Sequence, residues 1–251
     1  MRKNDALPRY FDELRAALSL LSRLPLPQGP HRGAAAAWTY PLAGAIIGAI
    51  AGLIGLVALW WGLPTALAAL AALAAQVIIT GAMHEDGLAD TVDGLWGGWT
   101  RARRLEIMKD SHIGAFGVIA LILSLTARWA ALWLLFQMGG GWAWAAIITA
   151  AAVSRAVMPA VMCALPPARA AGLSHATGRP STGTCAVAAG LAALIALVLV
   201  GWSVFGVVIW AALTTVAVAL IAKNKIGGQT GDILGGAQQM AEIAVLLSII
   251  V

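Results

Sequence analysis

Residues 34–61 read AAAAWTYPLAGAIIGAIAGLIGLVALWW, a run of 28 residues without a charged side chain. A helix that crosses a bilayer needs about 20 predominantly apolar residues, so this run is long enough to span a membrane. Close packing on another helix is indicated by its small residues Gly44, Gly48, Gly52 and Gly55. Further apolar runs cover about 64–83, 113–137, 142–164, 184–200, 204–222 and 235–251. We therefore expect an all-α membrane bundle of about seven spans, with the fifth and seventh short.

The composition of the whole chain agrees with a membrane protein. Of its 251 residues, 61% are hydrophobic and 11% are charged, whereas soluble domains are about one quarter charged. The net charge of +5 does not indicate a nucleic-acid partner, because the basic residues lie in short connections where membrane topology explains them. We expect one integral membrane catalytic domain over residues 1–251, made of an interfacial segment (1–33) and a transmembrane bundle (34–251).

The interfacial segment contains a predicted amphipathic helix over residues 9–23. Its apolar residues recur at three- and four-residue steps, at Phe11, Leu14, Leu18 and Leu21. Polar residues, including Glu13, occupy the other side of the helix. This pattern is typical of a helix that lies in the membrane interface. A soluble helix packed on the loops is the alternative.

The basic residues also predict the orientation of the chain. All Lys and Arg residues except Arg128 and Arg155 lie in the N-terminal segment or in the connections 84–112, 165–183 and 223–234. The intervening connections contain none. Because short basic loops stay in the cytoplasm, we expect a multi-pass protein of the cell inner membrane. Its active-site loops would face the cytoplasm, and its C-terminus would lie on the opposite face.

The densest polar stretch is His84-Glu-Asp-Gly-Leu-Ala-Asp-Thr-Val-Asp-Gly94, which we expect to continue directly from the second span. Asp86, Asp90 and Asp93 fall within about 60° of one helix face. Three carboxylates on one face repel each other and are costly beside a bilayer. A bound divalent cation resolves this cost, and hard oxygen ligands suit Mg²⁺, with Mn²⁺ as an alternative. Gly87 and Gly94 would let a phosphate approach the backbone. A solvated acidic turn is the competing interpretation.

Two further polar segments lie on the same predicted membrane face. Lys109, Asp110 and Ser111 end a short basic helix next to the third span. Asp110 is a candidate metal ligand, and Lys109 with Ser111 forms a candidate phosphate-binding pair. The second segment is glycine-rich, and its candidate anion- or nucleotide-binding residues are Gly228, Gln229, Thr230 and Asp232.

Arg128, Arg155 and Glu242 are predicted to lie inside membrane spans. Charged residues at such depth are functional candidates. Arg155 and Glu242 lie at similar depths, so they could pair, and binding of a substrate phosphate by Arg155 is an equal alternative. Arg128 lies deeper, and we expect its side chain to extend to the far interface.

Several of these motifs together resemble the cobalamin synthase family, also called the adenosylcobinamide-GDP ribazoletransferases. The matching segments are Arg23-Leu-Pro-Leu-Pro27, His84–Gly94, Leu105-Glu-Ile-Met-Lys-Asp-Ser111, Ser154-Arg155 and Gly227-Gly-Gln-Thr-Gly-Asp232. They keep the family's order over nearly the whole chain. The resemblance implies an Mg²⁺-dependent enzyme that joins adenosylcobinamide-GDP to α-ribazole or its 5′-phosphate. GMP would leave, and adenosylcobalamin or its 5′-phosphate would form.

The resemblance also implies roles for individual residues. Asp86, Asp90 and Asp93 match the family's acidic motif and would hold the ion, and one of them or Asp110 would accept the proton of the attacking 3′-hydroxyl. Glu85 stands at a variable position of the motif and receives no role. Segment 172–183 matches least, so recognition of the ribazole base stays open there, and His175 is interpreted as a loop residue. The sequence leaves open whether the protein forms a homo-oligomer.

Two other functions compete with this one. A CDP-alcohol phosphotransferase is suggested by Asp90-Thr-Val-Asp-Gly94, but Gly97-Gly98 replaces the Ala-Arg of that pattern, and its later pair of aspartates is missing. A membrane transporter is compatible with intramembrane charges and glycine-rich spans. Against transport, the acidic residues gather near one membrane face, whereas transporter sites lie near the midplane.

Overall fold

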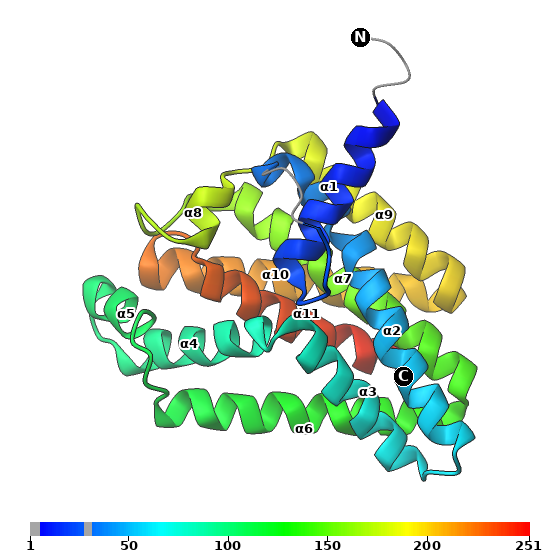
Figure 1. Cartoon of the computed structure of the whole chain (residues 1–251). Helices are drawn as coiled ribbons and strands as arrows, with labels where there is room; N and C mark the ends of the chain where they lie inside the picture. The colour runs from blue at the N-terminus through cyan, green and yellow to red at the C-terminus, as the bar shows by residue number, and fades with distance from the viewer. Residues whose placement is uncertain (1–5, 28–31) are drawn as a thin grey trace.

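The computed structural model describes residues 6–27 and 32–251, and this part of the chain is almost entirely helical (Figure 1). It contains no strand, only one isolated bridge between Pro167 and Gln229. The helices of the first half are α1 (Ala6–Leu21), η2 (Gly33–Thr39), α2 (Tyr40–Trp60), α3 (Thr65–Thr80), α4 (Met83–Gly97) and α5 (Arg101–Ile107). Those of the second half are α6 (Ala115–Met138), α7 (Gly140–Ala164), α8 (Leu173–Thr177), α9 (Thr182–Val200), η3 (Gly201–Ser203), α10 (Val204–Ile226) and α11 (Gly231–Ile250). The predicted all-α membrane architecture is confirmed.

Several helices are long and apolar enough to cross a bilayer. Within the described residues there are five such helical segments, and the bent pair α3–α4 could form a sixth. One of the five, Thr182–Ile226, is 45 residues long. Gly201 interrupts this segment with a φ of 56°, a conformation that glycine adopts without strain, and so divides it into α9 and α10. The count of seven spans stays a prediction.

The two spans that were expected to be short are longer than the sequence indicated. α9 has 19 residues and α11 has 20. Each begins earlier than the apolar run because a hydroxyl side chain caps it. Ser181 accepts a hydrogen bond from the Thr184 N–H, and Thr230 accepts one from the Ile233 N–H. Each helix thus has a polar first turn, which hydropathy alone does not identify as helical.

The sequence suggested that the acidic helix continues directly from the preceding span. The structure shows that it does not. α3 ends at Gly81 and α4 starts after Ala82, both with a positive φ, and the two helices are bent by 84°. Positive φ at Ala82 is unusual for a residue with a side chain, so the surrounding packing must hold this bend. The bend directs α4 across the bundle instead of along α3.

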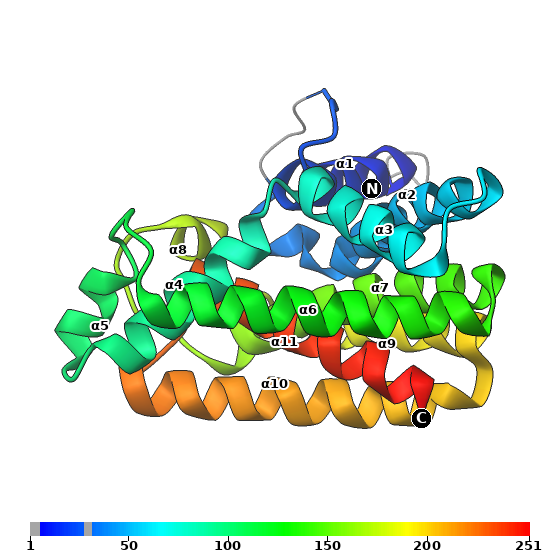
Figure 2. The ribbon, with the colours of Figure 1, turned by 90° about the horizontal axis from the view of Figure 1, so that it is seen from below.

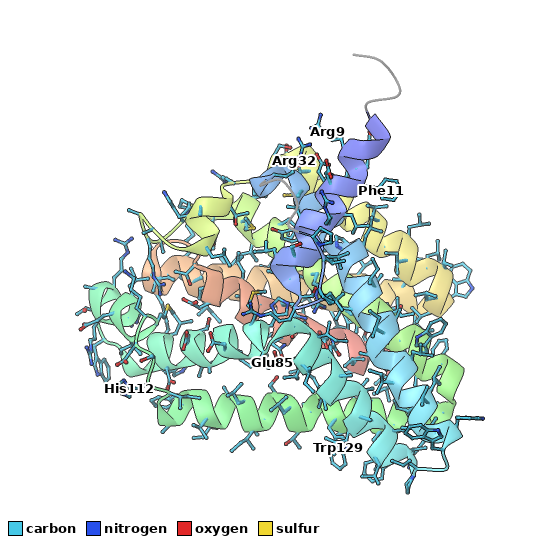
Figure 3. All side chains as sticks on the ribbon, viewed as in Figure 1. Arg9, Phe11, Arg32, Glu85, His112 and Trp129 are labelled. Atoms are coloured by element: carbon cyan, nitrogen blue, oxygen red, sulfur yellow. The ribbon has the colours of Figure 1, made fainter. Side chains whose placement is uncertain are left out.

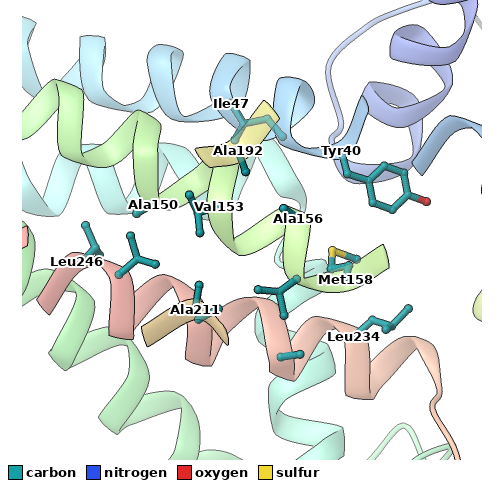
Figure 4. Packing of buried hydrophobic residues seen from close by; sticks show 14 of the residues in the cluster. Tyr40, Ile47, Ala150, Val153, Ala156, Met158, Ala192, Ala211, Leu234 and Leu246 are labelled. Carbon is teal, nitrogen blue, oxygen red and sulfur yellow. The ribbon is translucent and has the colours of Figure 1, made fainter. Parts of the chain in front are cut away.

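α2 packs closely on α7 through the glycines that the sequence singled out. A methyl group at Gly44 would collide with the Ala151 carbonyl, and one at Gly48 would lie 2.9 Å from the Ile147 oxygen. On its other side α7 faces α11, where Val153 and Ala150 point toward Leu246 (Figure 4). α7 is thus the central helix of the bundle.

The N-terminal helix α1 is present, but its two sides are not divided as expected. Phe11, assigned to the apolar side, is exposed, whereas Glu13, assigned to the polar side, is buried. The Glu13 carboxylate accepts a hydrogen bond of 2.7 Å from the Trp38 indole and one of 3.0 Å from Arg9. Burial of Glu13 thus follows from contacts with η2 that helical periodicity does not reveal. Whether α1 lies in the membrane interface stays a prediction.

The connections of the bundle separate into two ends (Figure 2). α5, α8 and the connection between α10 and α11 lie at one end. The short turns 61–64 and 201–203 and the C-terminus lie at the other end. The polar candidate segments therefore gather at the end that carries the basic loops.

Candidate functional site

α4 positions the acidic residues where it crosses α11. Gly87 and Gly235 form the crossing, because a methyl group at Gly87 would lie 3.1 Å from the Gly235 Cα and 3.0 Å from the Asp232 carbonyl oxygen. Both glycines are therefore needed for this close approach of two backbones. Gly87 therefore makes room for α11. It also lines the pocket described below, so approach of a phosphate to its backbone stays a prediction. Gly94 likewise faces Met108 and Arg104 of the α5 region.

The three aspartates of α4 lie in different surroundings. Asp86 is exposed, Asp90 is half-buried and Asp93 is buried. Asp93 accepts hydrogen bonds from the backbone N–H groups of Gly114 at 2.7 Å and Gly117 at 2.9 Å. These are free N–H groups at the start of α6, where a negative charge is stabilising. Asp93 thus fixes the start of α6, a contact that the spacing of the motif does not reveal.

Asp86 opens onto a pocket of about 240 Å³ between α4, α11, α7 and the segment 167–177. Its polar lining includes Asp86, Arg169, Thr230 and Asp232, and we call this region the acidic pocket. Its apolar lining includes Leu21, Met158 and Met162, together with the ring of Tyr40. A pocket with an apolar lining and a few converging polar groups is typical of a small-molecule site.

The predicted glycine-rich segment forms one side of this pocket. Gln229, Thr230 and Asp232 line it, and the Thr230 hydroxyl lies 3.1 Å from the Asp232 carboxylate. Gly228 instead packs against the segment after α7, where a side chain would meet the Ala168 nitrogen at 3.0 Å. Three of the four candidate residues therefore line the pocket, and Gly228 has a structural role; binding of an anion or nucleotide by this segment stays a prediction.

Arg169 is the principal residue of the pocket that the sequence missed. Its Nη2 lies 3.1 Å from Asp232 Oδ2, and both side chains are mostly buried. In the sequence, Arg169 stands out only as one of the basic residues that predict the orientation. Ser174 and His175 also line the pocket, and the Ser174 hydroxyl donates a hydrogen bond to the side-chain oxygen of Gln229. They belong to the segment that matched the family least, so no motif pointed to them.

Lys109, Asp110 and Ser111 do not reach the acidic pocket. All three are exposed, and among the described residues Lys109 has no ion pair. Asp110 instead accepts a hydrogen bond from the His112 ring at 2.7 Å and one from its backbone N–H at 3.1 Å. The His112 side-chain bond is the main reason why the pKa of Asp110 lies below its usual value. His112 stands at the outer end of the molecule (Figure 3).

A second group of charges lies inside the bundle, and we call Glu85, Arg128, Gln239 and Glu242 the inner cluster. Arg128 is 1% exposed and lies 2.6 Å from Glu85 and 3.0 Å from Glu242. The Gln239 carbonyl accepts a further bond from Arg128 at 2.9 Å. Glu85 lies where α4 meets the interior (Figure 3). The expectation that Arg128 extends to the far interface is wrong, because two carboxylates hold it inside.

Arg155 does not form the pair with Glu242 that the sequence suggested, since Arg128 takes that carboxylate. The Arg155 side chain is fully buried, and its Nη1 bonds to the Ala151 carbonyl of its own helix at 3.0 Å. Its Nε and Nη2 have no hydrogen-bond partner among the described residues. Arg155 does not line the acidic pocket, so a contact with a substrate phosphate stays a prediction.

The carboxylates of Asp86, Asp90 and Asp93 on α4 fit a hard divalent cation in chemistry, and of these three Asp86 lines the acidic pocket. Asp86 and Asp90 offer carboxylate oxygens, and neither has an ion pair with a described Lys, Arg or His. Asp93 is oriented by two N–H groups, as metal-binding carboxylates commonly are. Within residues 6–27 and 32–251, no three metal-binding side chains are gathered into a preformed site. Binding of Mg²⁺ by Asp86, Asp90 and Asp93 therefore stays a prediction.

Comparison with known proteins adds an independent finding. Residues 13–250 match the family described as cobalamin-5-phosphate synthase. A protein of Mesorhizobium japonicum is 44% identical over 95% of this chain and 93% of its own length, and one of Bradyrhizobium diazoefficiens is 43% identical over 97% and 95%. A third, from Brucella ovis, is 41% identical over 95% and 96%. All three are named adenosylcobinamide-GDP ribazoletransferase. No solved structure matches the chain.

Proposed function

This chain belongs to the cobalamin-5-phosphate synthase family, and from that premise we propose how its acidic pocket performs the reaction. The protein is an adenosylcobinamide-GDP ribazoletransferase, a membrane enzyme that joins the lower ligand to cobinamide in cobalamin biosynthesis. The relatives named above all carry this name, so the phospholipid and transport alternatives are set aside. The resemblance found in the sequence is confirmed.

The reaction we propose exchanges one P–O bond for another. The 3′-hydroxyl oxygen of the ribazole attacks the phosphorus that carries cobinamide, and the bond from that phosphorus to the GMP oxygen breaks. The hydroxyl proton passes to a carboxylate of the enzyme, and GMP leaves with the bonding electron pair. Such a transfer depends mainly on positioning and on stabilisation of negative charge.

Asp86 is the best-placed proton acceptor. It lines the pocket, and its carboxylate has no hydrogen-bond donor among the described residues. Asp110 is less suitable, because it does not line the pocket and the bond from His112 lowers its pKa. A lowered pKa makes a carboxylate a weaker base. Asp86 therefore takes this role in place of Asp110.

We assign the Mg²⁺ ligands to Asp86, Asp90 and Asp93, as the acidic motif indicates. When bound, the ion neutralises the diphosphate and stabilises the leaving group. The N–H groups of Gly114 and Gly117 hold Asp93, the end of this row nearest α6. Because basic connections flank the pocket, we place it at the cytoplasmic face of the inner membrane.

One observation supports this proposal above all: Asp86 and a set of apolar side chains line the same pocket. The experiment is an assay of purified protein in detergent with adenosylcobinamide-GDP and α-ribazole or its 5′-phosphate. Product should form with Mg²⁺, disappear with EDTA and return with added Mg²⁺. Turnover that is unchanged under EDTA would refute the metal assignment. Turnover of CDP-diacylglycerol, with none of the cobinamide substrate, would refute the function itself.

A further inference from the structure

Arg169 stands in the acidic pocket, at the end of a segment that is firmly attached to the start of α11. The Ala168 N–H donates to the Gln229 carbonyl at 2.8 Å, and the Gln229 N–H donates to the Pro166 carbonyl at 2.9 Å. Arg101 of α5 donates to the Ala168 carbonyl at 3.1 Å. The backbone that carries Arg169 is therefore fixed from two sides.

The side chain of Arg169 is also held in place. Its Nη2 donates to Asp232 Oδ2 at 3.1 Å, and the same oxygen accepts the Thr230 hydroxyl at 3.1 Å. Thr230 in turn caps α11. Asp232 thus binds one nitrogen of the guanidinium from the first turn of a long helix, which orients the planar group within the pocket.

Much of the hydrogen-bonding capacity of Arg169 remains unused. A guanidinium has five N–H donors in a rigid fork that suits phosphate oxygens. The structure gives Arg169 one hydrogen bond, to Asp232. Its Nε is buried and has no partner in the described part of the chain. A buried donor without a partner is costly unless a ligand satisfies it.

Arg169 is also the source of positive charge in the pocket. Asp86 and Asp232 are its acidic groups, and Arg169 is the one Lys or Arg among its lining residues in the described chain. Lys109, the phosphate contact suggested by the sequence, is exposed and outside the pocket lining. A phosphate-bearing substrate that enters here therefore meets its positive side chain at Arg169.

We propose that Arg169 binds a phosphate group of the substrate in the acidic pocket, and that Asp232 is the positioning residue that orients it. This inference rests on the proposed function. The phosphate has two sources in that reaction, the diphosphate of adenosylcobinamide-GDP and the 5′-phosphate of the phosphorylated ribazole. Both present the same oxygen atoms to the guanidinium.

The test compares steady-state kinetics of the wild-type enzyme and the Arg169→Gln variant, with α-ribazole and with its 5′-phosphate as acceptors. Loss of a hydrogen bond to a charged group corresponds to about a 10- to 100-fold rise in KM. If Arg169 binds the acceptor, KM rises for the 5′-phosphate alone. If it binds the donor, KM for adenosylcobinamide-GDP rises with either acceptor. Wild-type KM values for all three substrates would overturn the proposal, as would a fall in kcat alone.

Matched variants separate binding from folding. Arg103→Gln removes an exposed arginine at the same end of the molecule, 2.9 Å from Glu106, and should change no constant. Asp232→Asn should raise the same KM as Arg169→Gln, but less. If Arg169→Gln does not elute as a single species in size-exclusion chromatography, Arg169→Lys replaces it. Lysine keeps the charge without the planar fork, so wild-type KM values in Arg169→Lys would then count against the proposal.

Failure of the inference can be told from failure of the function. The wild-type enzyme is assayed first, and absence of product from adenosylcobinamide-GDP would refute the proposed function. Wild-type product formation together with unchanged kinetics in Arg169→Gln refutes only the role of Arg169.

Discussion

Glu85 and Asp86 are consecutive residues of α4, but their carboxylates lie in opposite electrical surroundings. Glu85 points into the inner cluster, where Arg128 lies 2.6 Å away and also pairs with Glu242 at 3.0 Å. Asp86 faces the acidic pocket, where the nearest arginine, Arg169, is paired with Asp232 instead. One step along a helix separates a paired carboxylate from an unpaired one.

This difference indicates what each region is for. The inner cluster joins α4, α6 and α11 and pairs Arg128 with two carboxylates inside the protein, so it contributes to holding the helices in register. The acidic pocket leaves negative charge without a counterion, a state that is stable only when solvent or a ligand compensates it. We expect variants of Asp86, and of Asp90 one turn further along the same face of α4, to lose activity, and variants of the inner cluster to lose stability.

The largest expected effect is on turnover. Asp90→Asn keeps the size of the side chain and removes one charge from the row of carboxylates. Turnover should fall by about 10²- to 10³-fold, as when one electrostatic contact to a transition state is lost. The protein should still elute as a folded species in detergent. Glu106→Gln, which removes an exposed carboxylate of α5, is the control and should behave as wild type. Near-normal turnover in Asp90→Asn would remove the distinction between the two regions.

The next effect concerns the stability of the inner cluster. Arg128→Met leaves Glu85 and Glu242 buried without their partner, which costs about 3–5 kcal/mol. The melting temperature in detergent should fall markedly. A triple variant that adds Glu85→Gln and Glu242→Gln removes the unpaired charges and should regain part of the loss. If Arg128→Met melts at the wild-type temperature, the inner cluster does not stabilise the fold.

The smallest effect is expected where Asp93 contacts the start of α6. In Gly117→Ala the new methyl group would collide with the Asp93 carboxylate, which overpacks the start of α6 at a cost of about 1–3 kcal/mol. Elsewhere in a helix this change normally stabilises, because alanine is the better helix former. Gly141→Ala, where a methyl group meets open space, is the control and should not lower the melting temperature. Equal melting temperatures of both variants would contradict the contact between Asp93 and α6.

Local patterns in the sequence predict the helices and some of the residues of the candidate site. Apolar runs identify the spans, and glycine spacing identifies the face of α2 that packs on α7. Asp86, Thr230 and Asp232 come from two motifs far apart in the chain, and the structure brings them to one pocket. These features depend on composition or on residues close together in the chain, so they can be predicted from a single sequence.

The contacts that the sequence could not supply depend on the angle between helices. The 84° bend at Gly81–Ala82 turns α4 across the bundle, and helical periodicity contains no information about it. That bend decides that Glu85 meets Arg128 and that Asp93 meets α6. Arg169 lies in a short irregular segment whose position is set by two hydrogen bonds to Gln229. No spacing rule links residues 169 and 232.

The most direct test of the contrast within α4 is binding of Mn²⁺, a spectroscopic substitute for Mg²⁺, measured by electron paramagnetic resonance. Asp90→Asn and Glu85→Gln each remove one negative charge from the same helix. We predict that Asp90→Asn weakens Mn²⁺ binding by at least about 10-fold, whereas folded Glu85→Gln binds as the wild type does. Equal binding by all three proteins, or equal weakening in both variants, would contradict a metal site on the Asp86 side of α4.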